Sequence, residues 1–250
     1  LLARAGTKVL VVDRELPLAQ RTVAMIQEEG GEAAAFSGDL TDTKACKQMV
    51  EAAVDRYGRL DFLDNNVGVG SLGSVVEEPQ AQFQRVMRIN VETMFLTAKH
   101  AIPAMKKTAG RGAIVNISSL AATSGATQLA YELSKAGVNR LTTHVAQGNA
   151  RHRVRANAIM MGFMDTPMAV SGIAAARGVP TSEVRAQRDA QVPLGGKMGT
   201  GWDTAYAALF FASDESAFIT GQVIAVAGGM DCLLYTSPSP RDRTRSRMPS

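Results

Sequence analysis

The run Lys8-Val9-Leu10-Val11-Val12-Asp13, near the start of the chain, decides its fold class. Its aliphatic residues follow one another without a polar break and stop at an aspartate, which is the pattern of a short strand buried on both faces. A helical pattern follows over residues 17–29 and is stopped by Gly30-Gly31. The same alternation of short apolar runs and longer helical segments continues along the chain, and it predicts βαβ units around a parallel sheet.

The other predicted elements repeat this alternation. Strands are expected over 32–37, 60–63, 113–117, 154–159 and 222–226. Helices are expected around Met49, Ala53 and Tyr57, with Thr41 or Asp42 as the cap, and over 80–107, 131–149, 181–190 and 202–212. Pro103 is expected to bend the long helix 80–107. The sequence therefore predicts an α/β fold with a doubly wound parallel sheet in three αβα layers.

Length and composition limit the class of protein. With 250 residues, 46% of them hydrophobic, the chain can bury one substantial core, so a single domain is expected over residues 1–231. The net charge is +4, and the four arginines and one aspartate of residues 241–247 supply +3 of it. No basic helix face remains to indicate nucleic-acid binding. No apolar run approaches the roughly 20 residues that span a membrane.

The cysteines and the two ends of the chain carry further information. Cys46 and Cys232 lack metal-ligand spacing and are too few for a disulfide framework, which favours a reduced, cytoplasmic protein without a metal site. The chain opens at Leu1 without an initiator Met, so nothing follows about a signal peptide. From Cys232 the composition becomes basic and rich in Ser and Pro. We expect 232–250 to be a disordered, non-native tail; the alternative is a basic tail that recruits a partner.

Tyr131 and Lys135 form the most informative pair. Four residues apart on a predicted helix, they project from one face. A nearby lysine cation favours the phenolate and lowers the tyrosine pKa from about 10 toward the working pH. A hydroxyl of the preceding pair Ser118-Ser119 could hold a carbonyl or alcohol oxygen, so the group suits proton transfer coupled to hydride transfer. The alternative is an exposed lysine beside a half-buried tyrosine.

Polar residues follow the ends of several predicted strands, where ligands bind in parallel sheets of this kind. They are Asp13, Asp39, Asn66, Ser119 and the stretch 160–166. Asp13 is placed to bind the ribose hydroxyls of an adenosine, which favours NAD over NADP; the alternative is that it caps the next helix. Arg14 beside it could contact a 2′-phosphate, so NADP stays open.

In its ordered motifs the chain resembles the short-chain dehydrogenase/reductase family over residues 1–230. The matching pieces are Gly38-Asp39-Leu40, Asn65-Asn66-Val67-Gly68, Ile89-Asn90-Val91, Ile114-Val115-Asn116-Ile117-Ser118-Ser119, Tyr131-x-x-x-Lys135, Val154-Arg155-Ala156-Asn157-Ala158-Ile159, Asp165-Thr166-Pro167-Met168, Pro193-Leu194-Gly195, Phe211-Ala212-Ser213-Asp214-Glu215 and Ile219-Thr220-Gly221-Gln222. The resemblance implies a Rossmann-like fold.

The resemblance also implies roles for the site residues. Tyr131 would be the general acid or base, and Lys135 would lower its pKa and hold the nicotinamide ribose. Ser119 would bind the substrate oxygen, with Ser118 as the alternative. Asn90 would support a water that leads protons to Lys135, or would form a buried helix bend. The implied cofactor contacts are Asp39 and Leu40 at the adenine, Asn66 and Gly68 at the ribose, and Met164 and Thr166 at the carboxamide.

The chain departs from the family pattern in three places. The glycine-rich phosphate loop and the strand before it, roughly two dozen residues, are expected upstream of Leu1, and loss of that central strand would expose the edges it pairs. The usual Pro-Gly is Met161-Gly162, and the usual aspartate before the closing glycines is Ala227.

Together these features imply an oxidoreductase that interconverts a secondary alcohol and a ketone with NAD, NADP being the other option. Two alternatives stay open: an NADPH-dependent 3-oxoacyl-thioester (acyl-carrier-protein) reductase, and a non-catalytic dinucleotide-binding remnant. Residues 163–192 are expected to form a lid over a small alcohol or ketone. The resemblance implies a homodimer or homotetramer formed through helices 80–107 and 131–149.

Overall fold

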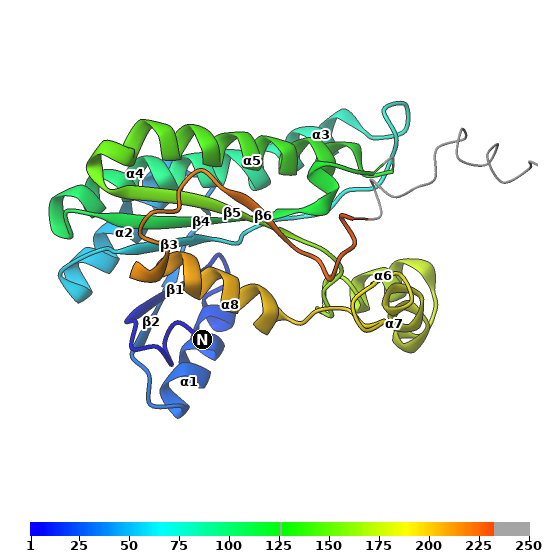
Figure 1. Cartoon of the computed structure of the whole chain (residues 1–250), viewed down its shortest axis with the longest axis horizontal. Helices are drawn as coiled ribbons and strands as arrows, with labels where there is room; N and C mark the ends of the chain where they lie inside the picture. The colour runs from blue at the N-terminus through cyan, green and yellow to red at the C-terminus, as the bar shows by residue number, and fades with distance from the viewer. Residues whose placement is uncertain (126, 233–250) are drawn as a thin grey trace, which may run out of the picture. The chain divides into compact units, whose positions relative to one another are not determined.

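The computed structural model describes residues 1–125 and 127–232, so the expected tail lies outside the described residues except for Cys232. The chain forms an α/β structure with parallel strands, as predicted (Figure 1). It separates into two compact units. The first combines Leu1–Met161 with Trp202–Val226, and the second combines Gly162–Gly201 with the segment that starts at Ala227. The single domain expected over residues 1–231 stays a prediction.

The first unit holds the six strands found in the described residues. They are β1 (Val9–Asp13), β2 (Ala33–Ser37), β3 (Phe62–Asn65), β4 (Gly112–Ser119), β5 (Val154–Met161) and β6 (Val223–Val226). Its α-helices are α1 (Leu16–Glu28), α2 (Thr43–Tyr57), α3 (Gln80–Met87), α4 (Thr93–Thr108), α5 (Leu129–Asn149) and α8 (Gly201–Ala212). The expected cap of α2 is Asp42, whose carboxylate accepts a hydrogen bond from the Lys44 amide at 2.9 Å.

The strands form two parallel sheets. One has the order β3-β4-β5-β6, and the other pairs β1 with β2. In the described residues no ladder joins β1 to β3. The central strand that the resemblance implies stays a prediction.

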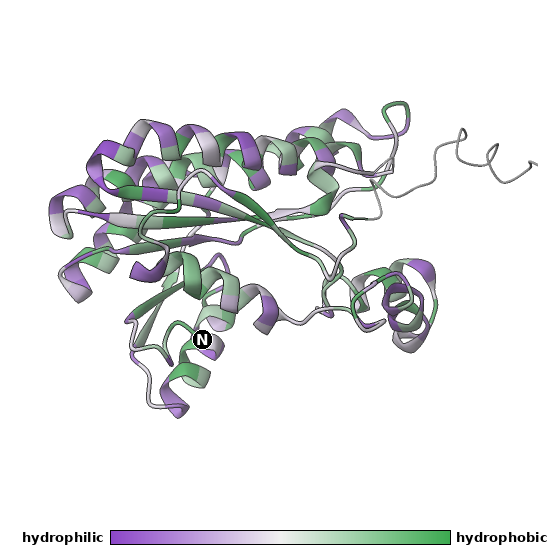
Figure 2. Cartoon of the chain, viewed as in Figure 1, coloured by the Kyte–Doolittle hydropathy of each residue, from purple (hydrophilic) through white to green (hydrophobic). Residues whose placement is uncertain are grey.

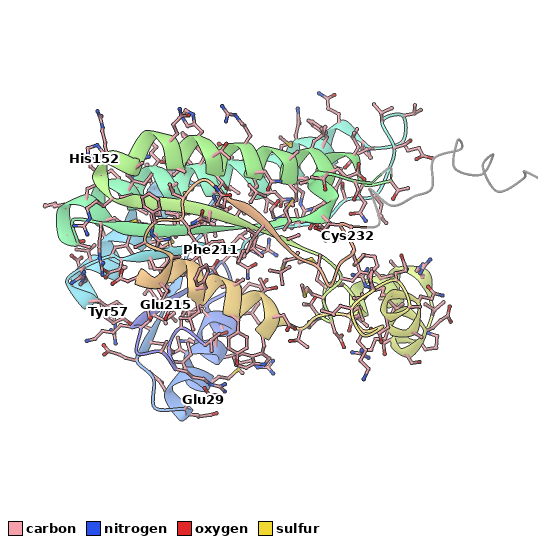
Figure 3. The ribbon with its side chains drawn as sticks, viewed as in Figure 1. Glu29, Tyr57, His152, Phe211, Glu215 and Cys232 are labelled. Atoms are coloured by element: carbon pink, nitrogen blue, oxygen red, sulfur yellow. The ribbon has the colours of Figure 1, made fainter. Side chains whose placement is uncertain are left out.

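Helices cover both faces of the four-stranded sheet. Figure 1 shows α4 and α5 on one face and α8 on the other. Because side chains alternate along β4, Ile114 packs with the cluster under α4 and α5, whereas Val115 and Ile117 pack with Phe211 of α8. Figure 2 shows the apolar character of these strands, and Figure 3 shows Phe211 between α8 and the sheet. The carboxyl end of β4 is thereby fixed from both sides.

The long helix predicted over 80–107 is interrupted, although not at Pro103. Pro103 lies inside α4, and the break is a π-helical segment, Arg88–Glu92, between α3 and α4. The π segment was not predicted, and beside it the Thr93 hydroxyl donates to the Ile89 carbonyl at 2.6 Å. A bend of α4 at Pro103 stays a prediction.

The second unit is small and helical. It contains α6 (Ser171–Arg177) and α7 (Thr181–Asp189). The predicted helix 181–190 is α7, whereas α6 was not predicted. Its core consists of Val170, Ala174, Val184, Val192 and Met198. In the described residues of the chain, no helix combines the length and the apolar character needed to cross a membrane.

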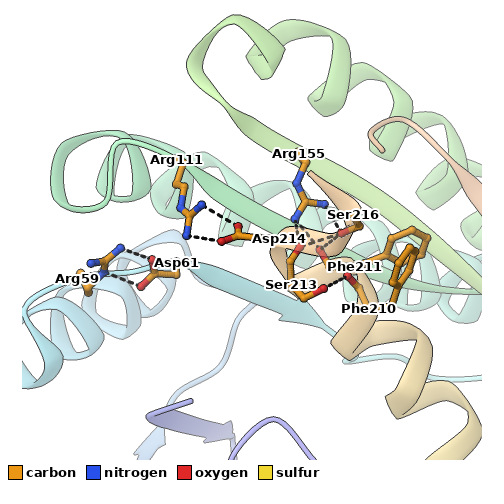
Figure 4. Close-up of polar contacts among 9 residues, drawn as sticks. All are labelled: Arg59, Asp61, Arg111, Arg155, Phe210, Phe211, Ser213, Asp214 and Ser216. Atoms are coloured by element: carbon orange, nitrogen blue, oxygen red, sulfur yellow. Dashed lines mark hydrogen bonds and ion pairs between the residues drawn. The ribbon is translucent and has the colours of Figure 1, made fainter. Parts of the chain in front are cut away.

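Arg155 ties the start of β5 to the end of α8 (Figure 4). Its guanidinium donates to the carbonyls of Phe211 at 2.9 Å, Ser213 at 3.1 Å and Ile219 at 3.4 Å, and to the Ser216 hydroxyl at 2.9 Å. Partial burial lowers the Arg155 pKa, but the group keeps its charge because an arginine pKa starts above 12. One side chain thus satisfies several carbonyls at a helix C-terminus.

Arg155→Met should therefore destabilise the protein by about 2–4 kcal/mol, because it removes four partly buried hydrogen bonds between β5 and residues 211–219. Arg111→Met is the matched control: Arg111 forms an exposed pair with Asp214 at 2.7 Å, so its loss should cost below about 1 kcal/mol. Urea unfolding of both variants measures the difference. Equal losses would contradict the role given to Arg155.

Candidate active site

The site is built where α5 packs on β4. Lys135 is 3% exposed, and its Nζ donates to the Ile117 carbonyl of β4 at 2.7 Å. The Ser118 hydroxyl returns a hydrogen bond to the Lys135 carbonyl at 3.2 Å. Strand and helix therefore exchange hydrogen bonds at adjacent positions, and the lysine side chain lies against the strand instead of extending into water.

Ser119 and Tyr131 meet at the same end of β4. Ser118 is fully buried, whereas Ser119 is half-buried at the last position of the strand. Burial raises the Tyr131 pKa, and side-chain hydrogen bonding with Ser119 offsets part of that rise. Lys135 Nζ lies 5.7 Å from the Tyr131 ring centroid. This geometry favours Ser119 over Ser118 as the hydroxyl that faces a substrate, because Ser118 is committed to the Lys135 carbonyl.

The Tyr131 pKa differs from the sequence-based expectation. It is raised, because burial disfavours the phenolate more than hydrogen bonding with Ser119 favours it. Burial also lowers the Lys135 pKa, to about 8. The expected lowering of the Tyr131 pKa by Lys135 is therefore not found in this structure. The Lys135 ammonium donates to the Ile117 carbonyl, and its burial disfavours the charged form of the lysine.

Asn90 lies at the centre of the π segment and is fully buried. Its Oδ1 accepts from the Val69 amide at 2.8 Å, and its Nδ2 donates to the Val69 carbonyl and the Ser134 hydroxyl, both at 2.9 Å. Ser134 in turn donates to the Tyr131 carbonyl at 2.7 Å. The buried helix-bend interpretation is what the structure has, and the proton-relay role stays a prediction.

Gly68 tests whether these residues fit a cofactor. A Cβ at Gly68 would lie 3.5 Å from Lys135 Nζ and 3.5 Å from Asn90 Oδ1. A larger side chain would therefore fill the space over the lysine ammonium. The absence of a side chain at Gly68 is compatible with a ribose there, since its hydroxyls can pair with an ammonium.

The residues expected at the adenosine end all belong to the first unit, and several already hold the backbone. Asp13 Oδ1 accepts from the amide of Glu15, the N-cap residue of α1, at 2.9 Å; α1 has no side-chain cap, so Asp13 does not cap this helix. Asp39 Oδ1 accepts from the Thr41 amide at 2.9 Å, and this hydrogen bond lowers the Asp39 pKa. Leu40 packs against the main core. Arg14 and Asn66 are exposed, and Arg14 pairs with Glu15 at 3.5 Å.

Met164 and Thr166 belong to the second unit. Met164 is buried there, and the Thr166 carbonyl accepts the Val170 amide at 2.9 Å. Their contacts with the carboxamide stay a prediction.

Three residues that contact the α5 segment around Tyr131 were not predicted. Ser134 bonds to the Tyr131 carbonyl, the Ser71 hydroxyl accepts the Tyr131 amide at 3.2 Å, and Glu78 Oε2 accepts the Ala130 amide at 2.8 Å. Ser71 and Glu78 lie more than fifty residues from their partners, so no local spacing reveals them.

Lys135→Met should show the cost of burying the ammonium. The folded pKa of about 8 lies below the ordinary 10.5, so the unfolded chain binds more protons between these values. The free energy of unfolding of the wild type should therefore rise with pH over this window. Below a pH of about 8, burial of the ammonium destabilises the folded protein by its full amount, about 3 kcal/mol.

Denaturant unfolding at pH 7 and at pH 10 measures this dependence. The stability of Lys135→Met relative to wild type should be highest at pH 7 and should fall toward pH 10. Lys44→Met, at an exposed position of α2, serves as control. A difference between Lys135→Met and wild type that does not change with pH would contradict the assignment.

Comparison with known proteins identifies the family of the chain. The family model described as enoyl-(acyl carrier protein) reductase matches residues 1–231. A 7alpha-hydroxysteroid dehydrogenase of Clostridium sardiniense is 34% identical over 232 residues, covering 91% of this chain and 85% of the relative.

Solved structures give the same result. A protein of Burkholderia xenovorans, described as a short-chain dehydrogenase/reductase, is 38% identical with a TM-score of 0.86, over 92% of this chain and 87% of that one. An NAD+-bound xylitol dehydrogenase is 30% identical with a TM-score of 0.84, over 91% of each chain. The chain belongs to the short-chain dehydrogenase/reductase family, whose members are NAD(P)-dependent oxidoreductases.

Proposed function

We propose that this protein interconverts a secondary alcohol and a ketone with a nicotinamide dinucleotide, using Tyr131 as general acid or base. The observation that carries the proposal is the convergence of Ser119, Tyr131 and Lys135 at the carboxyl end of β4. A phenol beside a hydroxyl and an ammonium is suited to move a proton at one oxygen atom.

The residues divide the chemistry among them. When bound, the nicotinamide supplies a hydride to the carbonyl carbon or takes one from the alcohol carbon. Ser119 holds the substrate oxygen by a hydrogen bond. In reduction Tyr131 gives its phenolic proton to that oxygen, and in oxidation the phenolate takes the proton back. The protonated Lys135 side chain stabilises the Tyr131 phenolate. It also binds a ribose hydroxyl beside Gly68, where no side chain intervenes.

Several finer features are part of the proposal. Asp13 at the end of β1 favours NAD, because a carboxylate pairs with ribose hydroxyls and repels a 2′-phosphate. The protein acts in the cytoplasm on a small molecule, without nucleic acid, as a homodimer or homotetramer. Residues 163–192, which include α6 and α7, cover the substrate.

One alternative has an observation in its favour. A relative described as the 3-oxoacyl-(acyl-carrier-protein) reductase of Thermotoga maritima is 32% identical over 231 residues, which favours an NADPH-dependent 3-oxoacyl-thioester reductase. Parallel assays with NADH and NADPH discriminate the two, since the acyl-thioester reading requires a preference for NADPH. The third reading, a non-catalytic dinucleotide-binding remnant, predicts cofactor binding without turnover.

Tyr131→Phe tests the proposal. We expect turnover of a panel of secondary alcohols and ketones to fall by about 10²–10⁴-fold, because the proton donor is lost, while NADH still binds. Ser118→Ala is the control, since its hydroxyl bonds to the Lys135 carbonyl and should affect turnover much less. Full activity in Tyr131→Phe would exclude the mechanism.

A further inference from the structure

Residues 71–78 form a loop that contacts the first turn of α5, where the Glu132 carboxylate also accepts the Gln128 amide at 3.0 Å. Helices begin with backbone N–H groups that lack partners inside the helix. The N-cap residue of α5, Gln128, makes no side-chain cap. Instead, the Leu129 amide donates to the Gly73 carbonyl at 3.2 Å, the Ala130 amide to Glu78 Oε2 at 2.8 Å, and the Tyr131 amide to the Ser71 hydroxyl at 3.2 Å.

The loop is closed tightly enough to act as a fixed support. The Gly73 amide donates to the Thr127 carbonyl at 2.8 Å, and the Glu78 amide donates to the Ser74 carbonyl at 2.9 Å. Gly73 has φ +133°, and a Cβ there would lie 3.1 Å from Glu78 Cα. Only glycine suits this position, and its close approach brings the Glu78 carboxylate back toward α5.

Glu78 makes the shortest of these three contacts, and it brings a negative charge to the positive end of the helix. It does so at Ala130, the residue before Tyr131. Its other oxygen, Oε1, is buried without a hydrogen-bond partner. One carboxylate oxygen thus accepts the Ala130 amide, while the other has lost its hydration without gaining a hydrogen bond. Burial of that second oxygen destabilises the folded protein.

We propose that Glu78 is a positioning residue for catalysis: by fixing the first turn of α5 it holds the Tyr131 phenol in register with Ser119 and Lys135. The inference rests on the proposed role of Tyr131. Glu78 acts through the backbone and not on the substrate. Displacement of a catalytic group by about 1 Å can lower turnover by about a hundredfold, so a contact of this kind affects rate more than binding.

The adjacent Glu77 provides a matched control. Its carboxylate accepts the Ser74 amide at 3.1 Å, and among the described residues it makes no hydrogen bond with α5. We expect Glu78→Ala to lower kcat by roughly 10- to 100-fold with little change in the Kd of NADH, and Glu77→Ala to stay near wild type. Glu78→Gln keeps an oxygen acceptor and should recover most of the activity. Equal kcat values in Glu78→Ala and Glu77→Ala, or a Glu78→Gln variant as impaired as Glu78→Ala, would overturn the proposal.

Two readouts do not depend on activity. Hydrogen exchange in Glu78→Ala should accelerate by about tenfold or more at the Ala130 and Tyr131 amides and stay unchanged at the C-terminal half of α5. Ultraviolet titration, taken as the difference from Tyr131→Phe, should show the Tyr131 pKa falling toward its ordinary value of about 10, because a loosened turn admits water to a phenol whose pKa burial raises.

These readouts distinguish a failure of the proposed function from a failure of the positioning role of Glu78. If the wild-type protein turns over no alcohol or ketone, the proposed function fails, and exchange and titration still decide whether Glu78 positions Tyr131. Unchanged exchange and an unchanged phenol pKa would reject the positioning role. If Glu78→Ala does not fold, Ser71→Ala removes the acceptor of the Tyr131 amide and should produce the same local exchange, whereas wild-type exchange in Ser71→Ala would count against the proposal.

Discussion

The contact between the Lys135 ammonium and the Ile117 carbonyl is the constraint on which the site depends. It joins β4, an inner strand of the larger sheet, to the helix that carries Tyr131, at the strand's carboxyl end. Buried amides extend the same interface: Asn116 bonds to Asn65 of β3 at 2.9 Å and to Thr142 of α5 at 2.8 Å. Buried polar groups with satisfied partners specify one register, because a shifted strand would leave them unpaired.

Charge is arranged around this interface in an unusual way. A lysine with a pKa of about 8 and a tyrosine with a raised pKa are both disfavoured in their charged forms by burial. The proposed mechanism needs a phenolate beside an ammonium. A partner that supplies polar contacts must therefore stabilise these two charged forms. A ribose over Gly68 is such a partner, so cofactor binding and activation of Tyr131 should be coupled.

Much of this could be predicted from the sequence, and the failures have physical causes. Short aliphatic runs such as Val9–Val12 identified the strands, although the residues of β1 are only half-buried and not buried on both faces as predicted. The Tyr131–Lys135 pair followed from helical spacing. The interruption at Arg88–Glu92 was missed because a π turn has no composition of its own. Glu78 was missed because it contacts a backbone amide far along the chain, and the direction of the Tyr131 pKa was missed because burial cannot be read from spacing.

The most direct test of the account is cofactor binding, followed by NADH fluorescence, in wild type and in Gly68→Leu, with the upstream segment present. The account predicts saturable binding by wild type and its loss in Gly68→Leu, because the leucine side chain would fill the space beside Lys135 Nζ and Asn90 Oδ1. Equal binding by the two proteins, or no binding by wild type, would contradict the placement of the cofactor at this interface.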